Sequence, residues 1–473
     1  MRDNVDGAMA TAELVALRRD RVRNAFSRVE ADVKAWLGRW KERKPQTSQI
    51  KRCGEVLGGM LKHLDERIDA LPADERALAA GREIEWDLAI VERLFRLLAT
   101  RFDQRRDPAL ELTLEAADEL IWSCVQQTWG LTANPLPLPL AYIDPAFSPS
   151  ATPRTKPPSA LPARDRLLAE MLRALPVPMI GLPTGTVDEP WWLVLIAHEV
   201  GHHVQYDAQA AEQVVTLTGA ALKEATGDAT WESWRHEVFA DLFAVLALGP
   251  VAIDATAELE WDVPENMAAG KSLYPPVIVR LALMAECAAA VGHTDVKYGP
   301  DSWTDTLAQV SAPRREVVAA QLTHVRAAVA AVLDLPLGRD TPLGRGSLRR
   351  LVDKAPPAGA APDRNTAKLR QWLKGEDASI EKSKGLPRSA VREAFLAYRG
   401  LDASAAPEQR AEARRLLRER SVSLITALDD QSTRPVQARA DNTAIVDRMV
   451  ELLRQAEAEA KAEAEAEAES GPA

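Results

Sequence analysis

The sequence has few cysteines and contains no long apolar run. Its three cysteines, Cys53, Cys124 and Cys287, lie far apart and form no Cys-x-x-Cys pair. They indicate neither a disulfide framework nor a cysteine-based metal site, and they favour a reducing compartment. No stretch of about 18 apolar residues occurs, so we expect no transmembrane helix. The polar N-terminus also lacks the apolar core of a signal peptide, and we therefore expect a cytoplasmic protein.

The chain also lacks an excess of basic charge. Its 473 residues carry 59 Lys and Arg against 69 Asp and Glu, a net charge of −10. This balance argues against a broad nucleic-acid surface or a membrane surface as partner. Arginines between residues 345 and 420 are interleaved with acids, and we interpret them as solvated helix faces, with a nucleic-acid module as the alternative. An Ala-Glu repeat at 455–473 is expected to be a solvated helix or a disordered segment.

Apolar periodicity predicts a mainly α-helical chain of two or three domains. Within residues 11–130, apolar side chains recur at helical spacing, as in Val22, Phe26, Val29 and Val33. Four or five amphipathic helices are implied there, and they would pack as a bundle. Further helices are predicted over the following ranges: 163–174, 190–206, 208–226, 229–248, 275–291, 313–334 and 366–456.

Proline marks two exceptions to this helical pattern. Nine of the 31 prolines lie between Pro135 and Pro162. They predict an extended connector, or an arm laid over a neighbouring surface, because proline fixes φ and lacks the N–H group. The apolar run 176–183 has proline at both ends, and this predicts a strand at the edge of a sheet.

Four of the seven histidines fall between His198 and His236, and two of them belong to the sequence His198-Glu199-Val200-Gly201-His202. Residues four apart on an α-helix project from the same face, one turn apart. His198 and His202 are thus placed to hold one metal ion. Glu199 lies to one side of that face, where it can reach a water on the metal. The spacing predicts one Zn²⁺ ion that activates water.

A second cluster, Glu237 and Asp241, lies one turn apart on the predicted helix 229–248, which is otherwise strongly apolar. Catalytic zinc takes three protein ligands and keeps one position open, so Glu237 is the predicted third ligand. Asp241 is placed to accept a hydrogen bond from the free ring N–H of a ligand histidine. Two carboxylates on a buried helix need a partner, because unpaired buried charge is costly, and zinc supplies one.

Together the two motifs resemble those of the gluzincin group of zinc metallopeptidases, in which a following helix adds a Glu ligand with Asp four residues on. The resemblance covers roughly residues 170–285. The downstream pattern of metzincins is absent, since Gln205 and Ala208 stand where it requires Gly and His. Tyr274-Pro275-Pro276, followed by Arg280, is similar to a His-Pro-Pro…Arg element of the prenyl-protein and heat-shock zinc proteases, with Tyr274 in place of the His.

This resemblance implies a zinc-dependent endopeptidase acting on a protein or peptide substrate. Glu199 would be the general base, and Tyr274 or Arg280 would stabilise the oxyanion. The predicted edge strand would bind an extended peptide by strand addition. Its predicted substrate-binding residues are Val177, Met179, Ile180 and Gly181.

The implied fold is mainly α, with an α+β catalytic core that is zincin-like and contains a small edge-strand sheet, flanked by helical domains. Protein partners are expected at the N- or C-terminal helical regions. The predicted segments are an N-terminal helical bundle (1–133), a Pro-rich connector or arm (134–164), the zinc metallopeptidase domain (165–335), a Gly/Pro linker (336–365), and a C-terminal helical region with the Ala-Glu tail (366–473).

A helical scaffold or effector with a structural or inactive zinc site is the alternative function. The intact Glu199 argues against it, because a purely structural site has no use for a base. His203 and His236 point away from the metal-binding faces of their helices and are interpreted as structural. The same interpretation applies to the remaining histidines: His63, His293 and His324.

Overall fold

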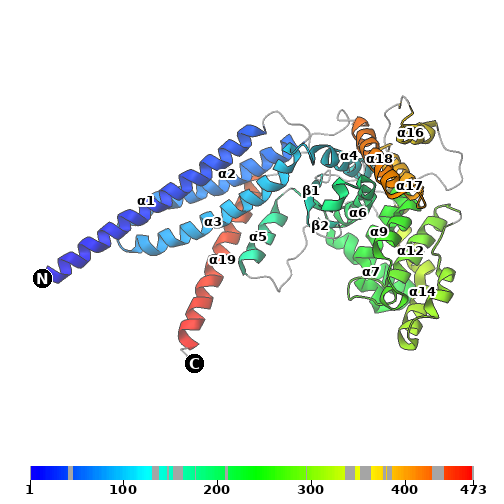
Figure 1. Cartoon of the computed structure of the whole chain (residues 1–473). Helices are drawn as coiled ribbons and strands as arrows, with labels where there is room; N and C mark the ends of the chain where they lie inside the picture. Colours follow the sequence, from blue (N-terminus) through cyan, green and yellow to red (C-terminus); the bar gives the residue numbers. More distant parts are fainter. Residues whose placement is uncertain are drawn as a thin grey trace. The chain divides into compact units, whose positions relative to one another are not determined.

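A computed structural model gives the fold of the chain, which is mostly helical (Figure 1). The structure describes residues 2–40, 46–129, 138–145, 149–152, 163–175, 177–207, 211–294, 296–335, 347–351, 364–376, 380, 386–428 and 442–470.

The chain divides into two compact units, each assembled from segments that are distant in sequence. Unit 1 contains Met1–Asp103, Arg154–Val177 and Val436–Ala473, and unit 2 contains Gln104–Pro153 and Pro178–Pro435. The five consecutive segments predicted from the sequence therefore do not correspond to separate structural units. Most of the predicted connector 134–164 and linker 336–365 lies outside the described residues.

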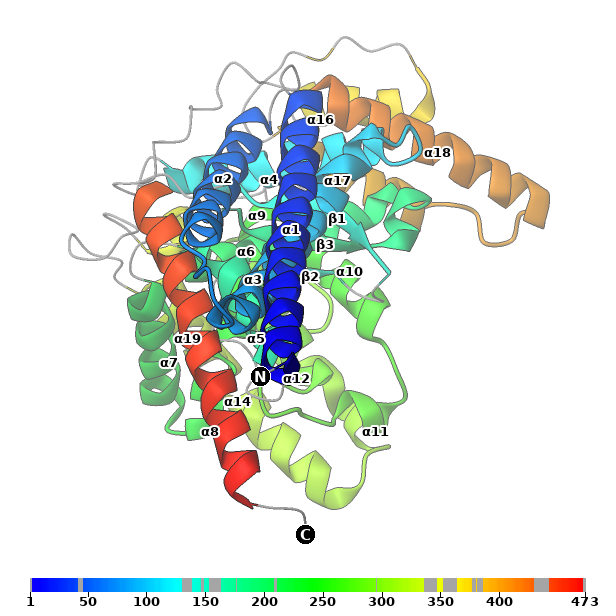
Figure 2. The ribbon, with the colours of Figure 1, turned by 90° about the vertical axis from the view of Figure 1, so that its left-hand side faces the viewer.

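Unit 1 is a helical bundle in which α1, α2 and α3 pack on one another. Its helices are α1 (Arg2–Arg39), α2 (Thr47–Asp69), α3 (Arg76–Asp103), α5 (Ala163–Ala174) and α19 (Asn442–Ser470). The helix α19, which contains the Ala-Glu repeat, packs against α2 and α5 (Figure 2). Gly59 permits this approach, since a Cβ at that position would lie 2.6 Å from Val446 Cγ2. The C-terminal helix thus belongs to the N-terminal bundle.

Unit 2 holds all the predicted site residues except Val177. Its longer helices are α4 (Glu111–Trp129), α6 (Ile196–Asp207), α7 (Ala211–Thr226), α9 (Arg235–Leu248), α10 (Val251–Glu260), α12 (Val277–Ala290), α14 (Ala312–Leu333), α16 (Arg364–Lys374), α17 (Leu386–Arg399) and α18 (Pro407–Ala427). Its short helices are η1 (Gln104–Arg106), η2 (Thr184–Val187), η3 (Pro190–Leu195), α8 (Ala229–Ser233), α11 (Pro264–Met267), η4 (Pro300–Trp303), α13 (Thr304–Leu307) and α15 (Leu348–Leu351).

The helix α9 lies at the centre of unit 2, where α6, α7 and α12 pack against it. Every residue from Glu237 to Leu248 is buried, as expected for a helix that is apolar on all sides. The helix ends at Gly249, whose φ of 69° is accessible to glycine at little cost, and Pro250 follows. The central helix therefore carries Glu237 and Asp241 deep into the core.

The C-terminal helices α17 and α18 pack on α4 and on η3, which leads directly into α6. Two sequence predictions are therefore wrong: α4 is not part of the N-terminal bundle, and residues 386–428 are not a separate C-terminal region. Amphipathic stripes identify the buried face of a helix but do not say which partner covers it. In this protein the partners are far apart in sequence.

Unit 2 contains one small sheet among its described residues, with the strand order β1-β3-β2. The strands are β1 (Leu140–Asp144), β2 (Ser150–Thr152) and β3 (Met179–Pro183). The strand β3 pairs parallel to β1 and antiparallel to β2. The predicted strand is confirmed, but its position at a sheet edge is wrong. Pro178 precedes the strand and Pro183 is its last residue, so neither proline interrupts its middle.

Among the described residues, one helix, α14, is long and apolar enough to cross a membrane by length and composition. This helix packs against α7 and α12 within unit 2. The three cysteines, Cys53, Cys124 and Cys287, are buried and form no disulfide, as expected from the sequence. Of the arginines between residues 345 and 420, Arg349, Arg414 and Arg415 all form ion pairs with acidic side chains.

The close approach of α6 to α9 depends on Gly201. A Cβ at this position would lie 2.8 Å from Ala240 Cα and 3.2 Å from Ala240 O, and these backbone atoms belong to a packed helix. We expect Gly201→Ala to force the helices apart and to destabilise unit 2 by about 1–3 kcal/mol, measured by chemical denaturation. Metal affinity should fall at the same time, because the two helices carry different ligands.

The matched control for this substitution is Gly185→Ala. A Cβ at Gly185 would meet no atom within 4 Å, so the same added methyl group should leave stability and metal affinity unchanged. Equal behaviour of the two variants would contradict the proposed role of Gly201.

Candidate metal centre

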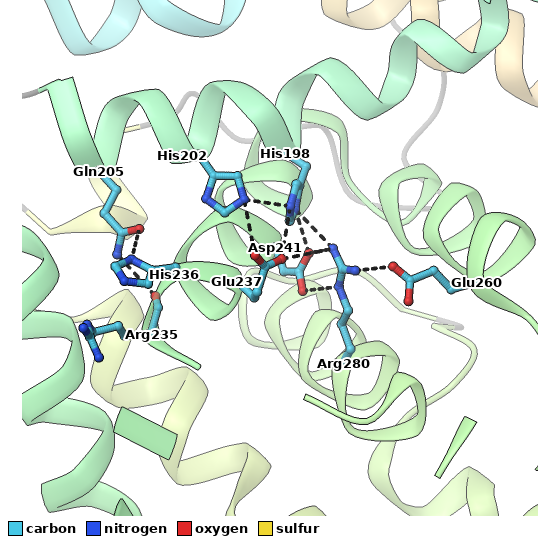
Figure 3. A network of polar contacts seen from close by, with 9 residues as sticks. All are labelled: His198, His202, Gln205, Arg235, His236, Glu237, Asp241, Glu260 and Arg280. Carbon is cyan, nitrogen blue, oxygen red and sulfur yellow. Dashed lines mark hydrogen bonds and ion pairs between the residues drawn. The ribbon is translucent and has the colours of Figure 1, made fainter. Parts of the chain in front are cut away.

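Two histidines of α6 and two carboxylates of α9 face one another across the contact between these helices (Figure 3). His198 and His202 project from the same face of α6, and their Nε2 atoms lie 3.1 Å apart. Glu237 approaches both rings: its Oε2 lies 3.5 Å from His198 Nε2, and its Oε1 lies 3.6 Å from His202 Nε2. The three residues predicted as ligands are therefore brought together, and each can offer one atom to a shared metal ion.

This arrangement fits a small divalent ion. Ligand atoms at zinc distances in a tetrahedron are separated from one another by about 3.3–3.6 Å. Here the two histidine nitrogens lie 3.1 Å apart, and each lies 3.5 or 3.6 Å from a different oxygen of Glu237, in or close to that range. All three residues are buried or half-buried, and they form a group that could hold a metal ion. Two imidazoles and one carboxylate are also a donor set that zinc accepts.

Asp241 lies behind His198, one turn further along α9 than Glu237. Its Oδ1 is 2.8 Å from His198 Nδ1, so the ring turns its Nε2 towards the ligand group. This is the hydrogen bond that the sequence predicts for Asp241. The corresponding Nδ1 of His202 is buried and has no hydrogen-bond partner among the described residues. The protein therefore fixes the orientation and tautomer of His198 more firmly than those of His202.

Arg280 of α12 holds Asp241 from the other side. Its Nε and Nη2 atoms donate to the two oxygens of Asp241 at 2.7 and 2.8 Å, and its Nη1 donates to Glu260. Its Nη2 also lies 3.8 Å from Glu237 Oε2 (Figure 3). The side chain is buried and bound to carboxylates behind the ligands. The sequence prediction that Arg280 stabilises an oxyanion is therefore not supported by its position; the guanidinium orients the cluster instead.

The pKa values of the cluster reflect this network of charges. Burial alone would lower the pKa of His198, but the charge and hydrogen bond of Asp241 outweigh it and raise the pKa to about 10. Burial lowers the pKa of His202 to about 3, and the charge of His198 contributes. Burial opposes ionisation of Glu237 and Asp241, yet His198 and Arg280 hold both pKa values below their usual range. Both carboxylates are thus ionised.

Glu199 and Tyr274 lie near the same group. Glu199 is buried on α6, beside the ligand His198. Tyr274 is 45% exposed in the segment that precedes α12. The charge of Glu237 raises the pKa of the Tyr274 phenol, and the charge of Glu199 acts in the same direction. Tyr274 is therefore a protonated hydroxyl near neutral pH, as its predicted role as a hydrogen-bond donor requires.

The predicted substrate strand has a different role from the one expected. Met179, Ile180 and Gly181 lie in β3, where β1 and β2 occupy both edges, and Val177 precedes the strand. Strand addition along these residues is therefore blocked, and the sequence prediction is wrong. The carbonyl oxygen of Met179 instead lies 3.1 Å from His203 Nε2, which ties the back of α6 to the sheet.

Two residues near the centre were not identified from the sequence, Tyr206 and Glu260. The ring of Tyr206 stacks on His236 with centroids 5.0 Å apart and lies 6.4 Å from the ring of His202. Its position four residues after His202 could have indicated the same helix face. Glu260 ends α10, and no local sequence pattern connects it to Arg280. His236 packs on Tyr206 and does not join the ligand group, which agrees with a structural role.

Comparisons of the chain with protein-family models, curated proteins and solved structures give no match. The arrangement of these side chains is therefore the basis for any functional inference.

We expect zinc binding to depend on both helices. Removing one of three ligands by His202→Ala or Glu237→Ala should lower zinc affinity by about 100-fold or more, beyond the loss typical of an outer-shell residue. Competition with a chelating dye, with folding checked by circular dichroism, measures this loss. The control is His324→Ala, whose side chain lies on α14 outside the ligand group, and it should retain wild-type affinity. Equal zinc affinity in all variants would contradict the assignment.

Metal binding should also release protons. The pKa of His198 is raised to about 10 and that of His202 is lowered to about 3, so near neutral pH, in the metal-free protein, His198 is a cationic imidazolium and His202 a neutral imidazole. A metal ion must displace the proton that competes for its ligand, so we expect release of about one proton per zinc ion. Titration calorimetry in buffers of different ionisation enthalpy measures this number. A binding enthalpy independent of the buffer would contradict the expectation.

Proposed function

We propose that the protein is a zinc-dependent endopeptidase whose catalytic centre is formed by α6 and α9. The observation that carries the proposal is the convergence of His198, His202 and Glu237, with Glu199 buried next to the first ligand. A bound zinc ion would lower the pKa of a coordinated water and polarise a carbonyl group. A site that only stabilises the fold would need neither an adjacent base nor an open position.

The remaining steps belong to side chains of this chain. Glu199 is the proposed general base, which takes the proton of the attacking water and passes it to the leaving amine. Asp241 and Arg280 hold His198 in position from behind, so that the ligand geometry is set before substrate arrives. Substrate binding then requires no rearrangement of these buried groups.

Tyr274 is the proposed hydrogen-bond donor to the oxyanion. Its hydroxyl is protonated near neutral pH, as an ordinary phenol is, and the charge of Glu237 raises its pKa further. Its partial exposure also leaves it accessible to a substrate. A donor directed at developing negative charge is worth roughly 3–4 kcal/mol in the transition state. Arg280 is not proposed for this role, because its donors are engaged by Asp241 and Glu260.

A helical scaffold or effector with a structural or inactive zinc site is the second candidate. The extensive helical packing of unit 1, with its C-terminal helix α19, is the observation that favours it. The two candidates differ in what they require of Glu199: an inactive site would tolerate its replacement without any loss.

The discriminating change is therefore Glu199→Gln, which preserves size and removes the base. We expect zinc content and folding to be retained and cleavage to fall by about 10²–10⁴-fold. Proteomic peptide libraries, followed by mass spectrometry of new termini, provide the measurement because they presuppose no substrate sequence.

The matched control is Glu224→Gln, the same chemical change at an exposed position on α7. It should cleave as the wild type does. If zinc-loaded wild type and Glu199→Gln give the same set of cleavage products, or none, the endopeptidase proposal is wrong.

A further inference from the structure

Exposed apolar side chains concentrate in one short segment of unit 2, residues 261–274. Among the described residues, four of the ten large hydrophobic side chains that remain exposed lie there. They are Trp261 (55% exposed), Val263 (57%), Leu273 (56%) and Tyr274 (45%). Single exposed hydrophobic residues are common on protein surfaces, but a local concentration indicates a binding surface.

The segment is held in place by contacts at several points. Met267 and Ala268 in its middle are buried, and the backbone of Lys271 exchanges two hydrogen bonds with that of Tyr274, at 3.1 and 3.3 Å. Glu265 of α11 accepts hydrogen bonds from the Ser311 amide and from Arg314. The exposed apolar side chains of segment 261–274 are therefore held by a backbone that is fixed by hydrogen bonds and burial.

Both ends of the segment connect to the metal centre. Glu260 immediately precedes the segment and accepts a hydrogen bond from Arg280. Arg280 lies after the segment, on α12, and also donates a hydrogen bond to Asp241. At its C-terminal end, Tyr274 lies within the electrostatic influence of Glu237 and Glu199. The segment therefore begins beside Glu260, which shares Arg280 with Asp241, and it ends at Tyr274, which the charges of Glu237 and Glu199 reach.

We propose that segment 261–274 is the substrate-binding wall of the centre, and that it binds large apolar side chains of an extended polypeptide. This inference rests on the proposed endopeptidase function and adds the class of substrate. The links of both ends of the segment to the metal centre favour a polypeptide that passes the zinc ligands over a second copy of this chain, which would cover the centre permanently. Strand β3 is already paired on both edges, so side-chain contacts with this wall would provide recognition in place of strand addition.

Binding can be measured separately from cleavage by using zinc-loaded Glu199→Gln as the background. The probe is a fluorescein-labelled decapeptide that contains leucine and phenylalanine, compared with the same peptide in which serine replaces them. In this background Leu273→Ser and Val263→Ser should each weaken binding of the apolar peptide about tenfold. Each substitution removes an aliphatic side chain that the bound peptide would cover. Binding of the serine peptide should be weaker than that of the apolar peptide and insensitive to both substitutions.

Leu112→Ser is the matched control, since Leu112 on α4 is also 56% exposed but lies outside the segment. It should bind the apolar peptide as the unsubstituted background does. All variants must retain zinc and their thermal transition; Leu273→Ala replaces Leu273→Ser if the latter does not fold. Equal binding of the two peptides, or loss of binding in Leu112→Ser alone, would overturn the inference.

Two further measurements separate this inference from its premises. A concentration-dependent dimer that Leu273→Ser dissociates, seen by sedimentation, would identify a second copy as the occupant and overturn the inference. If Leu273→Ser weakens peptide binding but wild type cleaves no peptide in the library, the proposed endopeptidase function fails while the apolar binding surface stands. If wild type cleaves but Leu273→Ser leaves KM for the apolar peptide unchanged, the substrate-binding wall fails alone.

Discussion

The contact between α6 and α9 at Gly201 and Ala240 is the constraint on which the candidate centre depends. His198 and His202 lie on one of these helices and Glu237 lies on the other, so the distance between the helix axes sets the distance between the ligands. With a glycine on α6 the backbones approach until a Cβ would lie only 2.8 Å from Ala240 Cα. A larger residue would widen the site by a few tenths of an ångström or more, and zinc ligation has little tolerance for such a change.

A second constraint links this contact to the surface. Arg280 bridges Asp241, which lies behind His198, and Glu260, which immediately precedes segment 261–274. A buried arginine costs several kcal/mol to desolvate and persists where carboxylates surround it, so it fixes the orientation of both partners. The orientation of His198 and the position of the exposed apolar segment therefore depend on one guanidinium group. Changes that loosen the segment are expected to reach His198 through this bridge.

Helical periodicity alone places His198 beside His202 and Glu237 beside Asp241, so each pair could be predicted from local sequence, and in the structure the two pairs come together. The sequence predicted that Asp241 accepts a hydrogen bond from a ligand histidine without identifying which one, and the structure shows that it is His198. The errors arose wherever the partner is distant in sequence. Proline at both ends of β3 did not reveal that β1 and β2 cover its edges, and an amphipathic stripe did not reveal that α4 packs on α18. Likewise, the motif that contains Arg280 did not show that Asp241 and Glu260 occupy its donors.

The charge balance of the buried network explains why it suits a divalent cation. Glu237, Asp241 and Glu260 contribute three negative charges around His198 and Arg280, and the guanidinium supplies one positive charge. In the metal-free protein the proton on His198 offsets part of the remaining charge, which is why its pKa is raised. Exchange of that proton for a dication brings the group closer to neutrality and retains the hydrogen bond to Asp241. The same carboxylates that make an empty site costly in a helical core therefore favour the ion, and the apolar surroundings of α9 strengthen that preference.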